Sequence, residues 1–562
     1  MALVNAGRAI VATLEAEGVK AVFGVPGGHT LPIYDALFDS PTIRHILVRH
    51  EQVAANMAAG YAQLTGEPGV CCVTAGPGAT NLVSGIAEAF IGALPIVILA
   101  GRGPTATAHR GASQEIDQVQ LFRPITKWAV RVDRADLIVS VLRQAFTVAR
   151  AGKPGPVLVD LPRDILAQQV EFGGYVAAGR PAPTRGDPAA VRAAAAALRT
   201  AQRPLIVAGG GTIASGAWEE VRRLAELLHA PVITTLAGRG SLPDDHPLTA
   251  GGIGHHRTAI TKRLLPGADA VLSLGCRFEE QETNWKPGFV PSPDACLIQV
   301  DIDAAEIGRS IPPQIGIVGD IRLVALDLLA GLDGHRPPTG NAQPSALAAD
   351  KEKLEAEIGA LANSDQRPVH PLRVIRQARE VFPRNASVAI DVGVLAQGMA
   401  GAFPYFKVYE PRSLIVPSSF YGMGFAASAL PVAKLVHPDR PALGFVGDGS
   451  FQMAMNVLPV AAECRLPVTW CILNDRALGS ILHGQQAQYG NRVIGTTFEV
   501  QPDFALIAQA CGCQGERVEE PAQVRGALER ALATNARGQP AVIDFHVARE
   551  RVQGSIDFFS GR

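Results

Sequence analysis

The feature that most constrains this chain is a pair of apolar runs, LGFV (443–446) and TWCIL (469–473), each followed closely by a carboxylate. Asp448 follows the first run inside GDGS, and Asp475 follows the second after an asparagine. The stretch QMAMNVLPVAAE between them supplies one helix, as in a strand–helix–strand crossover. Open parallel sheets bind ligands beyond the carboxyl ends of their strands. We therefore predict that the two strands are neighbours and that both carboxylates face one ligand.

The ligand expected at this point is a magnesium ion carrying a phosphate group. Carboxylate oxygens are hard ligands of the kind that Mg²⁺ prefers. Gly447 and Gly449 allow the backbone to approach a ligand closely, and a helix after Ser450 directs its first N–H groups at an anion. The alternative is that Asp448 and Asp475 only cap helices or turns, which explains either residue alone better than it explains the pair.

Strand-like and helix-like segments alternate along the chain, which predicts an α/β fold of three doubly wound parallel-sheet domains. A chain of 562 residues is too long for one hydrophobic core. We place the domains at residues 1–165, 187–335 and 369–549, with a C-terminal tail at 550–562. Residues 166–186 lose periodicity and gain glycine and proline, which is typical of a linker.

Composition excludes several classes of protein. The net charge of −1 gives no electrostatic reason to bind nucleic acid or an anionic membrane. The longest apolar run, 89–101, contains Pro95 and is too short to span a bilayer. The first residues lack the pattern of a secretory signal, so we expect a cytoplasmic protein. The eight cysteines lack zinc-site spacing and are expected to be unpaired, buried thiols.

The Gly-Asp-Gly sequence, followed one crossover later by Asn-Asp, resembles the metal–diphosphate motif of thiamine-diphosphate enzymes. The resemblance implies thiamine diphosphate and Mg²⁺ as cofactors, with the ion bound by Asp448, Asp475 and the backbone carbonyl of Ala477. It also implies that the three domains are, in order, pyrimidine-binding, central and diphosphate-binding. Most relatives have asparagine at the second position, so Asp475 departs from the pattern and adds negative charge.

The same family places a glutamate, within the sequence RHEQ, against the aminopyrimidine of the cofactor. RHEQ stands here at 49–52, and AGPGATN (75–81) follows at the spacing of the family. The resemblance implies that Glu51 activates the cofactor by hydrogen-bonding a ring nitrogen, while the cofactor itself is the electron sink. On the residues alone, Glu51 is also a first-turn glutamate that the helix dipole favours.

Met423 stands in SFYGMGF, where relatives carry a bulky apolar residue that bends the cofactor; a core methionine is the alternative. In the family, the glutamate and the metal motif of one active site belong to different subunits, so we expect at least a homodimer and favour a homotetramer. The cofactor-binding positions that the resemblance implies are Glu51, Pro77, Asn81, Gly393, Val394, Gln397, Gly422, Met423, Gly447, Asp448, Gly449, Ser450, Asn474, Asp475, Ala477, Leu478 and Gly479.

The three-domain order is similar to that of the acetolactate synthase superfamily, and within it the chain most resembles the benzaldehyde lyases, above all in GGHTLPIYDAL (27–37) and LHGQQAQYGNRVIGT (482–496). His29 stands where those lyases have a catalytic histidine. A group that titrates near neutrality can take or return a hydroxyl proton as a C–C bond breaks or forms. Gln114 matches a glutamine that binds substrate oxygens. The implied substrate pocket comprises Gly28, His29, Gln114, Gln397, Ser480, His483 and Gly484.

The pocket departs from both groups of relatives. Ser480 and Gly484 replace the methionine and tryptophan of acetolactate synthases, which argues against ordinary acetolactate synthesis. Arg163 and Gln397 replace aromatic residues of the benzaldehyde lyase pocket, so a more polar cavity is expected. Arg163 is able to bind a carboxylate or phosphate, but a basic residue is common at this place, and we favour no such role for it.

The central segment contains GGG (209–211), GCRF (275–278), VDID (300–303) and VGD (318–320). Relatives use similar segments to bind FAD or ADP, although benzaldehyde lyases retain several of them without flavin. We favour a central domain without a nucleotide and keep FAD or ADP as the alternative.

The expected function is that of a thiamine-diphosphate- and Mg²⁺-dependent C–C lyase or carboligase. Its small carbonyl substrates would be 2-hydroxyketones, aldehydes or 2-oxo acids, in the manner of benzaldehyde lyase. The alternatives are a decarboxylating carboligase of the acetolactate synthase type, a 2-hydroxyacyl-CoA lyase, a flavin-dependent oxidoreductase and, last, a non-catalytic binding protein.

Overall fold

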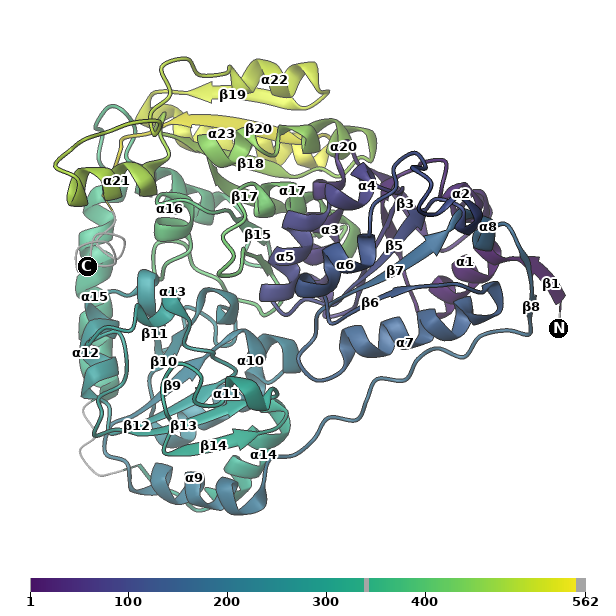
Figure 1. Cartoon of the computed structure of the whole chain (residues 1–562). Helices are drawn as coiled ribbons and strands as arrows, with labels where there is room; N and C mark the ends of the chain where they lie inside the picture. The colour runs from purple at the N-terminus through teal and green to yellow at the C-terminus, as the bar shows by residue number, and fades with distance from the viewer. Residues whose placement is uncertain (1, 338–342, 552–562) are drawn as a thin grey trace.

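A computed structural model describes residues 2–337 and 343–551 and contains three six-stranded parallel sheets, each flanked by helices (Figure 1). The prediction of three doubly wound α/β domains is confirmed. The tail expected at 550–562 lies outside the described residues, apart from 550 and 551. All eight cysteines are unpaired, as expected; five are buried, whereas Cys296, Cys464 and Cys511 are only half-buried.

The N-terminal sheet has the strand order β3-β2-β4-β5-β7-β6. Its strands are runs such as GVCCV and PVLVDLP that are buried throughout, as expected for a sheet covered on both faces. The strands are β2 (Ala21–Val25), β3 (Arg44–Leu47), β4 (Gly69–Val73), β5 (Ile96–Arg102), β6 (Trp128–Arg131) and β7 (Pro156–Pro162). The helices are α1 (Ala6–Ala16), α2 (Leu31–Phe38), α3 (Glu51–Thr65), α4 (Pro77–Thr80), α5 (Val83–Ile91), α6 (Gln118–Phe122), α7 (Ile138–Arg150) and α8 (Arg163–Leu166).

A small antiparallel pair extends this domain beyond the expected boundary. β1 (Ala2–Asn5) pairs with β8 (Gln169–Phe172), which lies in the segment expected to be linker. Strand β8 has four residues, of which one is buried. A strand this short shows too little alternation of apolar and polar residues to be identified from the sequence. The extended connection to the central domain therefore begins after β8, and it runs beneath the N-terminal domain in Figure 1.

The central sheet has the order β11-β10-β9-β12-β13-β14, which reverses between β9 and β12. Its strands are β9 (Pro204–Ala208), β10 (Val232–Thr234), β11 (Thr249–Gly252), β12 (Ala270–Leu274), β13 (Cys296–Asp301) and β14 (Ile315–Val318). Its helices are α9 (Pro188–Thr200), α10 (Gly210–Ser215), α11 (Trp218–Leu228), α12 (Ala259–Gly267), α13 (Glu280–Thr283) and α14 (Ile321–Gly331).

The C-terminal sheet has the order β16-β15-β17-β18-β20-β19, the same arrangement as the N-terminal sheet. Its strands are β15 (Ser387–Ile390), β16 (Leu414–Ile415), β17 (Ala442–Gly447), β18 (Thr469–Asn474), β19 (Gln514–Val518) and β20 (Ala541–His546). The helices are α15 (Gln343–Ala362), which leads into the domain, then α16 (Pro371–Val381), α17 (Phe425–Ala429), α18 (Ala433–Val436), α19 (Asp448–Gln452), α20 (Leu458–Glu463), α21 (Gly479–Gln488), α22 (Phe504–Ala510) and α23 (Val524–Ala536).

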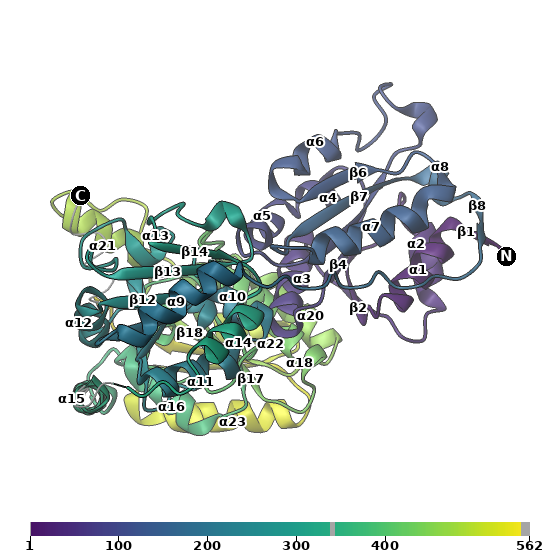
Figure 2. The same cartoon turned by 90° about the horizontal axis from the view of Figure 1, so that it is seen from below.

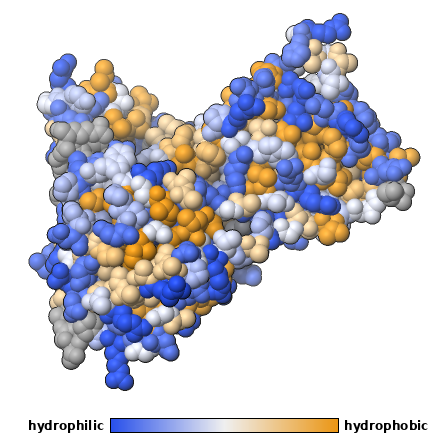
Figure 3. Space-filling model, turned by 60° about the horizontal axis from the view of Figure 1, so that its bottom comes forward, coloured by the Kyte–Doolittle hydropathy of each residue, from blue (hydrophilic) through white to orange (hydrophobic). Residues whose placement is uncertain are grey.

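Helix α3 joins the N-terminal and C-terminal domains. It is buried on almost every side, and one apolar core runs from the N-terminal sheet through α3 to α17 and the C-terminal sheet. The space-filling view shows two lobes with a notch between them, and apolar side chains lie in patches on both (Figure 3). No helix in residues 2–337 and 343–551 is both long and apolar enough to cross a membrane.

Candidate cofactor site

The carboxylates of Asp448 and Asp475 follow neighbouring strands. β17 and β18 pair in parallel, with Gly447 opposite Leu473, and Asp448 begins α19. Both side chains are buried, at 1% and 8% exposure. Burial raises the pKa of Asp448 to about 6. Burial and then the charge of Asp448 raise the pKa of Asp475 to about 7. Two buried carboxylates with such pKa values are stabilised by a cation between them.

One oxygen of this pair lacks a partner in the described chain. Asp448 Oδ1 is buried and accepts no hydrogen bond from any residue that the structure describes. Ala477, whose carbonyl is the third predicted ligand, is also buried. No cluster of three or more His, Cys, Asp or Glu side chains suited to a metal occurs in the described ranges, so the candidate site rests on two carboxylates and backbone oxygen. Hard oxygen donors beside an orphaned carboxylate oxygen fit Mg²⁺.

Gln501 takes part in this site, and sequence reasoning missed it. Its Nε2 donates to Asp448 Oδ2 at 2.6 Å and to Asn474 Oδ1 at 3.1 Å. Asn474 in turn donates to Asp544 Oδ1 at 2.9 Å. These bonds occupy one oxygen of Asp448 and leave the other available. No spacing rule pointed to Gln501, because its neighbours 496–503 form irregular structure.

Close backbone packing brings the other predicted diphosphate residues together. A Cβ on Gly449 would lie 2.6 Å from Leu478, and one on Gly479 would lie 2.7 Å from Val394 and 3.3 Å from Asp475 Oδ2. Ser450 Oγ donates to the carbonyl of Val392 at 3.1 Å, next to Gly393. The strand order reverses between β15 and β17, so these residues lie at the crevice where open α/β sheets bind ligands.

Gln397 and Met423 lie in the same domain. Gln397 is buried in a short π-helix (Ala396–Ala400), and its Nε2 has no partner among the described residues. Met423 is half-buried in the loop 418–424. The N–H of Gly422 donates to Glu88 Oε2 of the N-terminal domain at 2.9 Å, and that of Gly424 donates to Asp391 Oδ1 at 2.9 Å.

Glu51 lies in the N-terminal domain at the first turn of α3. Its side chain is only 9% exposed, and Asn81 Nδ2 donates to its Oε2 at 2.8 Å. Pro77 begins α4, one turn before Asn81. Glu51 is therefore a buried carboxylate with a fixed hydrogen-bond partner. A glutamate that served only to interact with the helix dipole would have no need to be buried.

His29 lies at the point where the strand order of the N-terminal sheet reverses. It follows β2, and its Nδ1 is 3.1 Å from Thr74 Oγ1, which follows β4. Burial, and then the charge of Arg163, lower the pKa of His29. The imidazole is therefore neutral near pH 7 and able to accept a proton.

Two glutamines of the N-terminal domain have different surroundings. Gln114 is exposed at φ 63°, and its carbonyl would lie 2.7 Å from a Cβ on Gly76. Gln118 is buried, accepts a hydrogen bond from the Gly76 N–H at 2.9 Å and donates to Asp160 Oδ1 at 2.8 Å. Gln118 thus fixes the turn before Pro77, and Gln114 remains free to meet a substrate.

The other predicted pocket residues lie on α21, in the C-terminal domain. His483 is buried, and burial followed by the charge of Arg551 lowers its pKa. Ser480 and Gly484 are on the same helix, and His483 helps to line a cavity of about 450 Å³ together with Arg549 and Arg551. The structure does not bring these residues together with Gly28, His29 and Gln114 in one chain: α21 and α4 lie well apart in both views (Figures 1 and 2).

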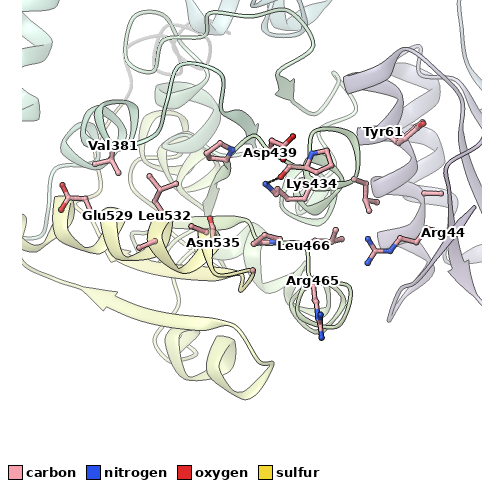
Figure 4. Close-up of a pocket in the computed structure, with 18 of the residues that line it drawn as sticks. Arg44, Tyr61, Val381, Lys434, Asp439, Arg465, Leu466, Glu529, Leu532 and Asn535 are labelled. Carbon is pink, nitrogen blue, oxygen red and sulfur yellow. Dashed lines mark hydrogen bonds between the residues drawn. The ribbon is translucent and has the colours of Figure 1, made fainter. Parts of the chain in front are cut away.

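A larger cavity, of about 1110 Å³, lies at the other end of the strands. Arg44 begins β3, Pro441 directly precedes β17, and Pro467 lies two residues before β18. Figure 4 shows Arg44 and Tyr61 on one side of it and Leu532 and Asn535 of α23 on the other. The predicted cofactor residues are at the opposite, carboxyl ends of these strands. This cavity is therefore not part of the predicted site, although it is the larger of the two.

The glycines of the central domain have a packing role. A Cβ on Gly209 would lie 2.0 Å from the Gly275 carbonyl oxygen, and one on Gly211 would lie 2.7 Å from Gly275 Cα. The Gly211 N–H already donates to the Gly275 carbonyl at 3.2 Å. The GGG turn is therefore explained by close backbone packing between the ends of β9 and β12, and it is no independent sign of FAD or ADP.

Comparisons with known proteins agree with this layout. Three family models match: the thiamine pyrophosphate enzyme N-terminal TPP binding domain at residues 4–121, the central domain at 191–328 and the C-terminal TPP binding domain at 395–545. The chain is 37% identical over 556 residues to a probable acetolactate synthase large subunit of Methanocaldococcus jannaschii, covering 96% of this chain and 91% of that protein. It is 33% identical over 560 residues to the acetolactate synthase isozyme 3 large subunit of Escherichia coli, covering 97% and 95%.

Proposed function

Because this chain belongs to the thiamine pyrophosphate enzyme family, we propose that it is a thiamine-diphosphate- and Mg²⁺-dependent carboligase acting on 2-oxo acids, as acetolactate synthases do. The observation that carries the proposal is the match to acetolactate synthases over almost their whole length. This supports the decarboxylating alternative of the sequence analysis better than its benzaldehyde-lyase-like main hypothesis.

In this proposal the C-terminal domain holds the ion and the diphosphate. Asp448, Asp475 and the carbonyl of Ala477 bind Mg²⁺, and the unpartnered Asp448 Oδ1 supports this assignment. The GDGS turn and the first N–H groups of α19 meet the diphosphate. When bound, the cofactor supplies a nucleophilic carbon and an electron sink for the bond next to a carbonyl.

The N-terminal domain supplies the residues that transfer protons or fix protonation states. Glu51, held by Asn81, binds the pyrimidine ring of the cofactor and fixes its protonation state. His29 and Gln114 meet substrate oxygens, with the neutral His29 as the proton acceptor. Thr74 Oγ1 is 3.1 Å from His29 Nδ1, so Nε2 is the ring nitrogen assigned to the substrate.

A complete active site requires two chains in this proposal. Helix α21, which follows Asp475 in the chain, is far from α4, which Asn81 follows, in both views of the monomer (Figures 1 and 2). Large apolar side chains are also exposed beside Asp475: Ile494 is 81% exposed and Val500 is 90% exposed. A second chain packed against this segment would cover them. In this proposal a homodimer is the smallest active unit, and we favour a homotetramer.

A second candidate is cleavage or formation of 2-hydroxyketones, as in the benzaldehyde lyases. His29 supports it, because a lyase needs a base for the hydroxyl proton of the substrate. Gly484 supports it as well, because glycine there leaves room for a larger substrate group than tryptophan would.

The deciding experiment supplies purified protein with the cofactor, Mg²⁺ and either pyruvate or an acyloin. Release of CO₂ from pyruvate with formation of a carboligation product would support the first proposal. Aldehyde release from the acyloin without CO₂ from any 2-oxo acid would support the second. The absence of both reactions, and of cofactor binding, would contradict the two together.

A further inference from the structure

The loop 418–424, which carries Met423, lies where the three domains meet. From the N-terminal domain, Glu88 accepts hydrogen bonds from backbone N–H groups of the loop. From the central domain, Glu279 Oε2 accepts a hydrogen bond from Ser419 Oγ at 2.6 Å. From the C-terminal domain, Asp391 accepts the N–H of Gly424 at 2.9 Å. A loop held from three directions has little freedom to move Met423.

Glu88 makes the most extensive of these contacts. It lies on α5 and is 2% exposed. One carboxylate oxygen accepts the N–H of Ser418 and the other accepts the N–H of Gly422 at 2.9 Å. Its backbone carbonyl also accepts a hydrogen bond from Ser418 Oγ at 3.3 Å. Both oxygens of this buried carboxylate thus accept hydrogen bonds from the same loop.

The fit between Glu88 and the loop is tight. A Cβ added to Gly422 would lie 2.9 Å from Glu88 Oε2, so a larger residue there would push the carboxylate away from the loop. Tyr421, the residue before, has φ 58°, a conformation that bulky side chains rarely adopt. Such backbone strain persists only where the surrounding contacts enforce it, and it is concentrated at functional sites.

Met423 lies between two carboxylates. Gly422, before it, donates its N–H to Glu88, and Gly424, after it, donates its N–H to Asp391. Asp391 is fully buried and also accepts the N–H of Ala427 at 2.8 Å. Asp391 belongs to the same domain as the loop, whereas Glu88 belongs to the domain that contains Glu51. Glu88 therefore lets the N-terminal domain set the position of Met423.

We propose that Glu88 is a positioning residue for the cofactor: it fixes the loop 418–424 so that Met423 holds the cofactor in its reactive shape. This inference rests on the proposed function. A carboxylate is required because it accepts at both oxygens, whereas a glutamine would turn its NH₂ group toward one of the two N–H donors. The isosteric change Glu88→Gln therefore loosens the loop without creating a cavity.

The first measurement is amide hydrogen exchange of the full-length, cofactor-free protein. Glu88→Gln should speed exchange in residues 418–424 by about tenfold, the effect of losing a hydrogen bond to a charged group. The matched control is Glu463→Gln. Glu463 contacts Arg49 and so joins the same two domains, but its side chain is 55% exposed and its ion pair is with Arg49 instead of the loop. Unchanged exchange in Glu88→Gln would overturn the proposal.

The second measurement uses protein saturated with thiamine diphosphate and Mg²⁺. The rate at which the reactive ring carbon of the cofactor exchanges its proton for deuterium should fall about tenfold in Glu88→Gln and stay unchanged in Glu463→Gln. A role in stability alone would lower the melting temperature and leave this rate unchanged at saturation, which would overturn the proposal.

If Glu88→Gln fails to fold, Gly422→Ala tests the same contact while keeping the glutamate, because its methyl group would lie 2.9 Å from Glu88 Oε2 and separate the carboxylate from the Gly422 N–H. It should give the same two changes, and unchanged values would overturn the proposal. Failure of the proposed function has a different signature: the wild-type protein would bind no thiamine diphosphate, while the amide exchange of the loop would still report whether Glu88 holds it.

Discussion

Asn81 Nδ2 donates a 2.8 Å hydrogen bond to Glu51 Oε2, so the carboxylate at the start of α3 is held by the segment that follows α4. The bond restrains one oxygen of a side chain that is 9% exposed and leaves the other oxygen for a ligand. A carboxylate restrained in this way can meet a ring nitrogen with little loss of conformational freedom.

Glu51→Gln should lower the turnover number by at least about a hundredfold, because the amide no longer supplies a carboxyl group to the pyrimidine ring. Cofactor binding should weaken much less, because the diphosphate and the ion are held by the other domain. Turnover and the cofactor dissociation constant, measured on the same preparation, separate these effects. Full activity in this variant would contradict the role assigned to Glu51.

Removal of the metal should destabilise the protein. Asp448 and Asp475 are two buried carboxylates whose repulsion a cation relieves. At a Mg²⁺ concentration 100 times the dissociation constant, binding stabilises the fold by about 2.7 kcal/mol. The melting temperature should therefore rise when excess Mg²⁺ replaces chelator, and the rise should vanish in Asp448→Asn. An equal rise in the variant would place the ion elsewhere.

Gln501→Leu should weaken Mg²⁺ binding about 10- to 100-fold, the usual effect of losing a residue that orients a metal ligand. The reason is that Gln501 Nε2 fixes Asp448 through Oδ2. Titration calorimetry with Mg²⁺ measures the affinity directly. Gln509→Leu is the matched control, since Gln509 is exposed on α22 and its side chain donates to the Gly515 carbonyl. Equal affinities in both variants would remove Gln501 from the site.

The difference between Asp448 and Gln501 shows what the sequence could predict. Asp448 and Asp475 were predictable because strand, turn and helix patterns next to them are local, and a crossover of ordinary length makes their strands neighbours. Gln501 and Glu88 act through contacts with residues far away in the chain, and no local pattern marks such a contact. The spacing of Gln114 and Gln118 likewise does not reveal that only Gln118 is buried.

His29 should act as a base over an unusually wide pH range. Burial and Arg163 lower its pKa, so the neutral form persists below pH 6.5, the ordinary midpoint for histidine. The acid limb of kcat/KM for the preferred substrate should therefore lie below pH 6.5. His29→Asn should lower kcat/KM about 100-fold and abolish that limb. An identical profile in the variant would show that His29 does not transfer the proton.

Two inactive variants should restore activity to each other when their subunits mix. If each site combines Glu51 of one chain with Asp448 of the other, a hybrid of Glu51→Gln and Asp448→Asn chains has one site with both substitutions and one intact site. Random reassociation of equal amounts makes half of the dimers hybrid, so about a quarter of wild-type activity should return. Each variant mixed with itself is the control. If both residues served a site within one chain, every site would carry a substitution and the mixture would stay inactive. Activity of the mixture therefore distinguishes a site shared between chains from a site within one chain.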